Sequence, residues 1–220
     1  MVELRGALAD DPQAAVTILT TEHFNLQTAR AATISETNGR ASVFLGSVSA
    51  GLVAFAFAGQ TSQAALYTFG LVLFPVLCFL GLVTFQRALQ ASIDDTHYLL
   101  RINRIRRFYF EAAPQLAPFL ARPAATDDIV DVLRTEGFVR SGRWQLMLSI
   151  VGAVGVINSV LIGVTAGLAV AALTGGELWV ATPVGLAAFA ASVPLHQRYQ
   201  LTQRHQAHQA ILDLFDDGNG

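Results

Sequence analysis

The fold is decided by an uncharged stretch from Ala41 to Gln86, which reads ASVFLGSVSAGLVAFAFAGQTSQAALYTFGLVLFPVLCFLGLVTFQ. None of these 46 consecutive residues is Asp, Glu, Lys or Arg. About 20 helical residues cross the roughly 30 Å hydrocarbon core of a bilayer, so the stretch is about twice as long as one span. The polar sequence 59–63 divides it near the middle. We therefore expect two spans, near residues 41–58 and 64–85.

A second region repeats this layout closer to the carboxyl end. Trp144 to Gly176 is uncharged over 33 residues, and after the single Glu177 another uncharged run reaches Gln197. The turn signal at 174–177 divides the region into spans near residues 146–173 and 178–195. These runs predict an all-α integral membrane protein with four transmembrane helices in two hairpins and cytoplasmic helical extensions.

The overall composition favours the same fold class. The chain has 220 residues, of which 53% are hydrophobic and 14% charged, and its mean hydropathy is +0.47. An ordinary soluble domain carries about 25% charged residues. The competing interpretation is a soluble four-helix bundle, but such a bundle would expose large apolar patches to water.

The basic residues predict how the spans are oriented. All fourteen are arginines, and the two hairpin connections contain none of them. Because short loops rich in Lys or Arg stay in the cytoplasm, we expect the amino end, the carboxyl end and the large connection to be cytoplasmic. We accordingly expect a multi-pass membrane protein, with the lipid bilayer as a partner.

These signals divide the chain into five segments. We expect a cytoplasmic helical segment at residues 1–40, a transmembrane hairpin at 41–85 and a cytoplasmic helical connection at 86–143. A second hairpin follows at 144–195, and a cytoplasmic helix and tail at 196–220. Asp11 and Pro12 predict a helix start, and a second start is possible at Thr20 or Thr21. This helix either continues into the first span or breaks at the turn signal Asn38–Gly39.

The connection after the second span begins with a helical pattern. Tyr98, Ile102, Ile105 and Tyr109 form one apolar stripe, which predicts a continued helix to about Phe110. Beside this stripe lie Arg101, Arg104, Arg106 and Arg107. We interpret these arginines as contacts for anionic lipid headgroups or for an anionic ligand or cytoplasmic protein partner.

Small residues recur every four positions in the first and third spans. The residues predicted to pack helices are Ser42, Gly46, Ala50 and Ala54 in the first span, and Gly155, Asn158, Ser159, Gly163 and Gly167 in the third. Small side chains on one face allow two helix backbones to approach closely. We expect these spans to form the crowded centre, packed on each other or across a subunit boundary. Asn158 needs a partner in a neighbouring helix or in another copy, so a homo-oligomer is expected.

No pattern of residues indicates catalysis. The four spans contain no Asp, Glu, Lys or Arg, which counts against a proton-coupled pump or an acid–base catalyst in the bilayer. His205 and His208 are three residues apart but have no nearby cysteine, so we predict no metal site. The sequence contains no phosphate-binding loop and no HExxH motif. We therefore expect no enzyme activity, no cofactor and no nucleic-acid partner.

Four short segments carry a resemblance to a known group of proteins. They are LTTEHF at 19–24, AATISE at 31–36, GRAS at 39–42 and INRIR at 102–106. In these segments the chain resembles a family of helical actinobacterial membrane proteins to which we can attach no activity. The order helix–span–span–helix is also similar to the two-span effector modules of bacterial conflict systems.

Three functional hypotheses follow from the sequence. The leading one is a non-enzymatic membrane module that acts through helix packing and self-association, in the form of a pore-forming or membrane-perturbing effector. An alternative is a small channel or transporter built from two parallel repeated halves. Another is a membrane-anchored protein that binds its partner through residues 86–143.

Overall fold

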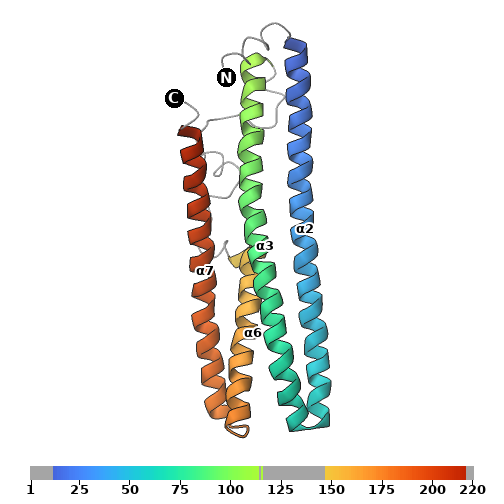
Figure 1. Cartoon of the computed structure of the whole chain (residues 1–220), viewed down its shortest axis with the longest axis vertical. Coiled ribbons are helices and arrows are strands. Elements are labelled where there is room, and N and C mark those ends of the chain that lie inside the picture. The colour runs from blue at the N-terminus through green and yellow to red at the C-terminus, as the bar shows by residue number, and fades with distance from the viewer. Residues whose placement is uncertain (1–11, 114, 116–146, 217–220) are drawn as a thin grey trace. The chain divides into compact units, whose positions relative to one another are not determined.

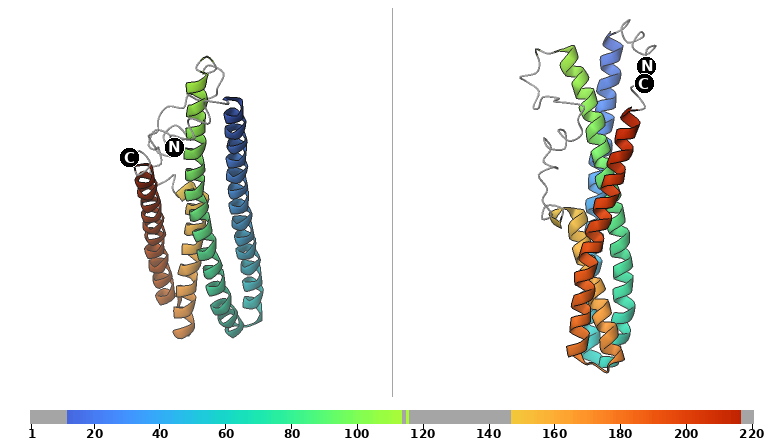
Figure 2. Two further views of the ribbon diagram at one scale, coloured as in Figure 1. Left: turned by 45° about the horizontal axis from the view of Figure 1, so that its top comes forward. Right: turned by 90° about the vertical axis from the view of Figure 1, so that its left-hand side faces the viewer.

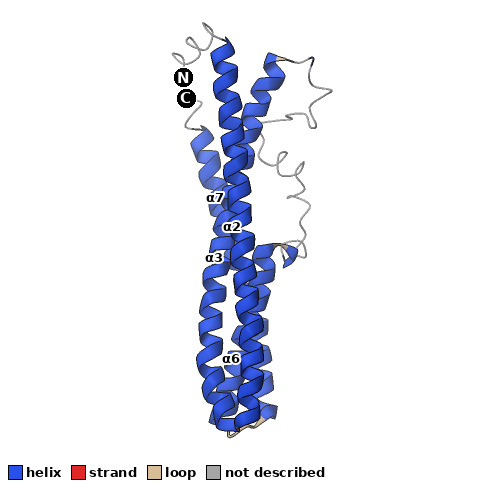
Figure 3. Ribbon diagram, turned by 90° about the vertical axis from the view of Figure 1, so that its right-hand side faces the viewer, coloured by secondary structure: helices blue, strands red, loops and turns tan. Residues whose placement is uncertain are grey.

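The described residues of the chain form four long helices. A computed structural model describes residues 12–113, 115 and 147–216 (Figure 1). The helices are α2 (Pro12–Thr61), α3 (Gln63–Ala112), α6 (Ile150–Leu173) and α7 (Leu178–Asp216). No strand occurs in these residues (Figure 3). Each helix contains a stretch long and apolar enough to cross a membrane, so an all-helical chain with four such lengths is confirmed.

The observed helix bounds settle several expectations. Helix α2 begins at Pro12 and runs through Asn38–Gly39 without a break, so the continuous helix is the correct alternative. Helix α3 continues past the second predicted span to Ala112, and α7 continues past the fourth to Asp216. The part of the 86–143 connection beyond Ala113, apart from Gln115, lies outside the described residues.

Local capping explains where the helices start and stop. Ser62 is the single residue between α2 and α3, and its Oγ accepts a hydrogen bond from the Ala65 amide at 3.0 Å. Ser149 caps α6 in the same way through the Gly152 amide at 3.1 Å. The turn to α7 contains Gly175 and Gly176 with φ of 72° and 100°, a left-handed conformation that favours glycine.

The chain divides into two compact units, which are described separately. The first comprises residues 1–35 and 94–141, and the second comprises residues 36–93 and 142–220. In the first unit, Leu26 of α2 packs with Ile102 and Ile105 of α3. Tyr98 and Tyr109 pack against this small core, so the predicted apolar stripe of α3 is its packing face.

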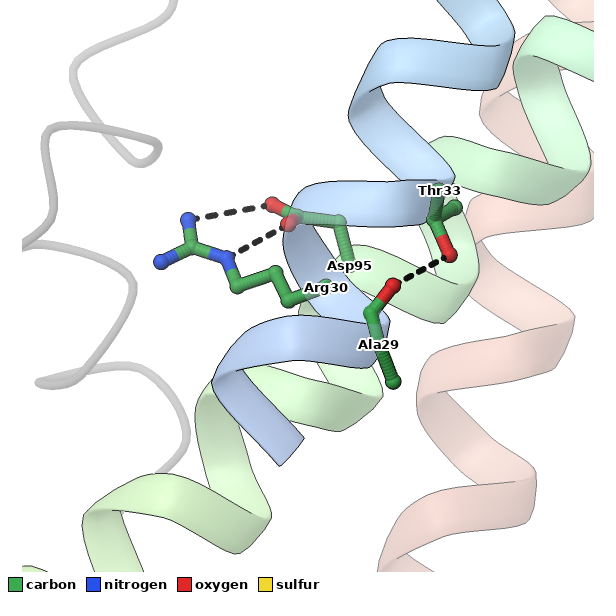
Figure 4. Close-up of polar contacts among 4 residues, drawn as sticks. All are labelled: Ala29, Arg30, Thr33 and Asp95. Atoms are coloured by element: carbon green, nitrogen blue, oxygen red, sulfur yellow. Dashed lines mark hydrogen bonds and ion pairs between the residues drawn. The ribbon is translucent and has the colours of Figure 1, made fainter. Parts of the chain in front are cut away.

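An ion pair joins α2 and α3 in the first unit (Figure 4). Nε of Arg30 donates to Oδ1 of Asp95 at 2.6 Å, and the guanidinium also reaches Oδ2 at 3.4 Å. The two side chains are 29% and 13% exposed. Exposed ion pairs contribute about 0–1 kcal/mol, and the partial burial and two-point geometry place this pair towards the upper end of that range.

His23 is the second polar feature of this unit. Its Nε2 accepts a hydrogen bond from Nε2 of Gln27 at 2.7 Å, while its buried Nδ1 has no partner among the described residues. Burial lowers the pKa of His23 below its ordinary value of 6.5, and the charge of Arg106 lowers it further. The unfolded chain therefore binds a proton more readily, so this histidine destabilises the unit as the pH falls below about 6.5.

The second unit is built around a core of large apolar side chains. Phe44 of α2, Phe74 and Phe85 of α3 and Val154 and Leu161 of α6 all belong to it, and each is at most 3% exposed. The ring of Phe74 also meets Phe55 edge to face at 4.9 Å between centroids. Aromatic packing of this kind joins α2 to α3 and both of them to α6.

Helices α6 and α7 are held together by glycines instead. They lie side by side in Figure 1 and in both views of Figure 2. A Cβ atom added at Gly163 would lie 2.8 Å from the carbonyl oxygen of Gly185, and one added at Gly185 would lie 2.9 Å from that of Gly163. Gly167 faces the Ala181 carbonyl in the same interface. The two backbones therefore touch, and no larger residue fits without a shift.

This contact predicts a difference between two Gly→Ala substitutions. Gly163→Ala should destabilise the protein by about 1–3 kcal/mol, because the new methyl group forces α6 and α7 apart. Gly39→Ala is the matched control, since Gly39 is exposed on α2 and a Cβ there meets nothing within 4 Å. It should be neutral or stabilising by up to about 1 kcal/mol, because alanine favours the helix. Thermal unfolding of the intact chain in detergent measures both, and equal midpoints for the two variants would contradict the close approach.

Candidate functional site

A buried polar cluster between α6 and α7 is the candidate site. We define the polar cluster as Asn158 and Ser159 of α6 with Ser192 and His196 of α7. Asn158, Ser159 and Ser192 are 1%, 0% and 6% exposed. Buried polar side chains in apolar surroundings require hydrogen-bond partners, so the arrangement of their donors and acceptors decides what the cluster can do.

The hydrogen bonds of the cluster identify one tautomer of His196. Nδ1 lies 3.0 Å from the carbonyl oxygen of Ser192, which can only accept a hydrogen bond. Nδ1 therefore carries a proton, and the hydroxyls of Ser159 and Ser192 lie 3.3 Å from it. Nε2 is then free to accept from Nδ2 of Asn158 at 3.4 Å. These contacts assign a donor role to Nδ1 of His196 and an acceptor role to Nε2.

Asn158 connects the cluster to the rest of the second unit. Its Oδ1 is buried and has no hydrogen-bond partner among the described residues. A Cβ added at Gly81 of α3 would lie 2.3 Å from this oxygen and 3.0 Å from the ring of Phe44 in α2. The amide of Asn158 therefore sits where α2, α3 and α6 meet. Only glycine at position 81 leaves room for it.

A small cavity lies on the other side of His196. Its volume is about 10 Å³, and its lining includes Phe85, Gly155, His196 and Gln200. The side chain of Gln200 is 2% exposed, and its Nε2 has no partner among the described residues. A space of this size approaches the minimum for one water molecule. The ring of Phe85 closes it edge to face against His196, with 4.9 Å between centroids.

Two further contacts join α3 to the same part of α7. Nε2 of Gln86 donates to the Tyr199 hydroxyl at 2.7 Å, and the Arg204 guanidinium donates to Oγ of Ser92 at 3.0 Å. Burial lowers the pKa of Arg204. A guanidinium still keeps its charge at any physiological pH. These bonds extend the polar contacts of α7 by two turns beyond His196.

The arrangement is suited to fixing helices against one another. The four side chains of the polar cluster point to one another, and the adjoining cavity accommodates little more than a water. Hydrogen bonds between membrane helices are worth about 0.6–2 kcal/mol each. The cluster therefore sets the register of α6 against α7 and anchors both to α3.

The third-span residues predicted to pack helices do so within one chain. Gly163 and Gly167 meet α7, Gly155 lies against Phe85 and His196, and Asn158 and Ser159 belong to the polar cluster. Their neighbours are α7 and α3. The expectation that the third span packs on the small residues of the first is therefore wrong within one chain.

The first-span residues are placed differently from the expectation. Ser42, Gly46, Ala50 and Ala54 are all exposed. Helix α2 instead packs through the face of Ala41, Phe44, Val48 and Gly51. The physical reason is that burying large side chains such as Phe44 removes more apolar surface than burying alanines does. Packing of the small-residue stripe across a subunit boundary stays a prediction.

The arginines predicted to contact anions do not share one environment. Arg101, Arg104 and Arg107 are exposed on α3 in the first unit, whereas Arg106 is partly buried and its charge acts on His23. Three of the four thus lie on the accessible side of the helix. Their contact with lipid or with an anionic partner stays a prediction.

The sequence did contain a signal for His196, which we did not predict as a site residue. Ser192 and His196 are four residues apart, so they share one face of α7. In a region without charges, this polar pair matches the adjacent Asn158 and Ser159. Pairing polar residues between two apolar runs would have identified the cluster, although not which helix approaches which.

The cluster predicts a large effect for His196→Ala. The substitution removes the ring that packs on Phe85 and leaves the Asn158 amide without its partner, while the Ser159 hydroxyl keeps only the Gly155 carbonyl. Unpaired buried polar groups cost about 1–3 kcal/mol, so the unfolding midpoint in detergent should fall clearly. His205→Ala on the exposed side of the same helix is the control and should change stability by less than about 0.5 kcal/mol. Similar midpoints for the two variants would show that the cluster carries little stability.

Comparison with known proteins adds no assignment to this geometry. Profiles of protein families, curated proteins and solved structures were all compared with the chain, and none matches it. The resemblance to actinobacterial membrane proteins therefore stays a prediction. The four apolar helices of the chain indicate a multi-pass membrane protein.

Proposed function

We propose that the chain is a four-span protein of the bacterial inner membrane that acts without catalysis, through helix packing and self-association. The observation that carries this proposal is the exposure of its apolar helices. In the most apolar stretch of each helix, between 11% and 28% of the residues are buried. Apolar surface left uncovered on this scale is suited to lipid and not to water.

The proposed topology has two hairpins. Helices α2 and α3 form one and α6 and α7 the other, with both connections on the outer side of the membrane. All fourteen arginines then lie on the cytoplasmic side. A helix of 50 residues is about 75 Å long, whereas the hydrocarbon core is about 30 Å thick. More than half of α2 and of α3 is therefore available for cytoplasmic extensions.

The proposed surface for self-association is the small-residue stripe of α2. Ser42, Gly46, Ala50 and Ala54 are exposed, and a Cβ added at Gly46 would meet nothing within 4 Å. In lipid, such a face supports close helix contacts through dispersion. The glycines of the α6 stripe already form a close contact with α7 inside the chain. The exposed stripe of α2 is therefore the one available to a second copy.

A packing role also agrees with the polar groups of the spans. Asn158, Ser159, Ser192 and His196 bond one another inside the chain. The action on the membrane would then come from assembly, as in a pore-forming or membrane-perturbing effector.

The topology can be tested with single cysteines in a Cys78→Ser background. Gln60→Cys and Thr202→Cys are both exposed positions. A membrane-impermeant maleimide added to intact cells should label Gln60→Cys, and it should label Thr202→Cys only after the cells are broken. The opposite labelling pattern would show that the orientation is reversed. Labelling of both variants in intact cells would exclude the proposed topology.

Self-association can be tested in the same background by oxidative cross-linking in membranes. Ala50→Cys should give a disulfide-linked dimer, because the stripe brings two α2 helices within the 4.4–6.8 Å that a disulfide spans between Cα atoms. Leu52→Cys is the matched control, since Leu52 is 49% exposed but lies on another side of α2. Equal cross-linking of the two variants would indicate random collision, and none at Ala50→Cys would exclude the stripe as the interface.

A further inference from the structure

An apolar groove runs along α6 and α7 in the second unit. Its volume is about 550 Å³, which is within the roughly 300–1,000 Å³ range of pockets that enclose a small ligand. The walls include Phe55 of α2, Leu66 and Tyr67 of α3, and residues of both α6 and α7. Gly163, Gly167 and Gly185 form part of the lining, so the close contact of these helices also hollows the surface.

The dimensions of the groove match one leaflet of a bilayer. Its lining extends from Val160 to Ala171 on α6 and from Leu178 to Phe189 on α7. Eleven helical steps correspond to about 16 Å. Half of a roughly 30 Å hydrocarbon core is about 15 Å. One end of the groove lies next to the turn between α6 and α7, and the other lies near the middle of both spans.

The side chains of the groove are suited to a hydrocarbon tail. Apart from Tyr67 and Thr182, every lining residue is aliphatic, aromatic or glycine. Tyr67 lies near the turn end, where its hydroxyl accepts a hydrogen bond from Nε2 of Gln63 at 3.2 Å. Tyrosines at this depth typically sit at the membrane–water interface. The groove is thus apolar along its length and polar at its outer end.

Charge at the turn end discriminates between headgroups. The connections on this side contain no arginine, and the single charge is the exposed carboxylate of Glu177, adjacent to Leu178 of the lining. A carboxylate attracts an amine and repels an anionic phosphate ester. The headgroup that fits is therefore zwitterionic with a positively charged amine, such as phosphatidylethanolamine.

We propose that this groove binds one acyl chain of an amine-bearing phospholipid from the outer leaflet. The inference rests on the proposed function, because it requires α6 and α7 to lie in lipid. The bound chain would fill the hollow beside the glycines, and Glu177 would contact the amine.

The test uses the full chain reconstituted in vesicles of equal parts phosphatidylethanolamine and phosphatidylglycerol. The protein is then extracted in mild detergent, and the lipid that stays bound is counted by mass spectrometry. We expect about one phosphatidylethanolamine per chain, since the groove has room for about one tail. Val164→Trp should fill the groove and reduce this retention about tenfold, the equivalent of about 1.4 kcal/mol. Glu177→Gln should remove the preference for phosphatidylethanolamine.

Val72→Trp is the matched control. Val72 is 64% exposed on α3 and does not line the groove, so this variant should retain lipid like the parent. Leu186→Trp, at a 62% exposed position of the α7 wall, replaces Val164→Trp if that variant fails to fold. Loss of lipid in Val72→Trp as well would place the bound lipid elsewhere and overturn the proposal.

The remaining outcomes separate this inference from the proposed function. Unchanged retention in both groove variants overturns the inference and leaves the membrane topology intact. Smaller oligomers in those variants, with unchanged lipid, would mean that a second copy of the chain occupies the groove. If the protein does not associate with the vesicles at all, the proposed function itself is wrong. Equal retention of phosphatidylglycerol would exclude the headgroup selection by Glu177.

Discussion

Serine and threonine hydroxyls in the apolar stretches of the helices bond within the chain, whereas Oδ1 of Asn158 has no partner among the described residues. This requirement for hydrogen-bond partners shapes the rest of the second unit. The hydroxyls of Ser47, Thr84 and Thr165 donate to carbonyls four residues earlier, at 2.7–2.9 Å. Ser159 does the same, and its oxygen also lies by His196. In surroundings without water, an unpaired hydroxyl or amide costs several kcal/mol, so such groups occur where a partner is within reach. In the polar cluster, side chains of α6 and α7 supply one another's hydrogen-bond partners.

Two kinds of packing follow from the side chains that remain. Helices α2 and α3 meet through aromatic rings such as Phe55 and Phe74, which bury large areas and keep the backbones apart. Helices α6 and α7 meet through Gly163 and Gly185, where the backbones touch. Contact between the backbones of α6 and α7 gains dispersion energy, but the glycines have no side chains to fill the space beside the contact. A groove of about 550 Å³ therefore remains along these two helices. The same glycines therefore allow both the close contact of α6 with α7 and a groove large enough for a lipid tail.

The first unit relies on a different balance. Its core of Leu26, Ile102 and Ile105 is small, and the Arg30–Asp95 pair adds a contact of modest strength. The described contacts between α2 and α3 in this unit bury little apolar surface, so each polar contact between these helices carries a larger share of their stabilisation. His23 works against that stability at acidic pH, because burial disfavours its charged form. The described part of this unit is therefore less stable at acidic than at neutral pH.

The sequence by itself determined the four apolar helices, the start of α2 at Pro12 and the packing stripe from Tyr98 to Tyr109. These features depend on hydropathy, capping and periodicity, which are properties of neighbouring residues and can be added up along the chain. Only the tertiary structure decided that Asn158 pairs with His196, 38 residues away. It also decided that the small-residue stripe of α6 is covered, whereas the small-residue stripe of α2 is exposed. Both outcomes depend on which helix faces come into contact. Which helix faces meet depends on the combined shape of all the side chains. Glycines spaced by four allow close contact between two helices but do not specify which helix is the partner.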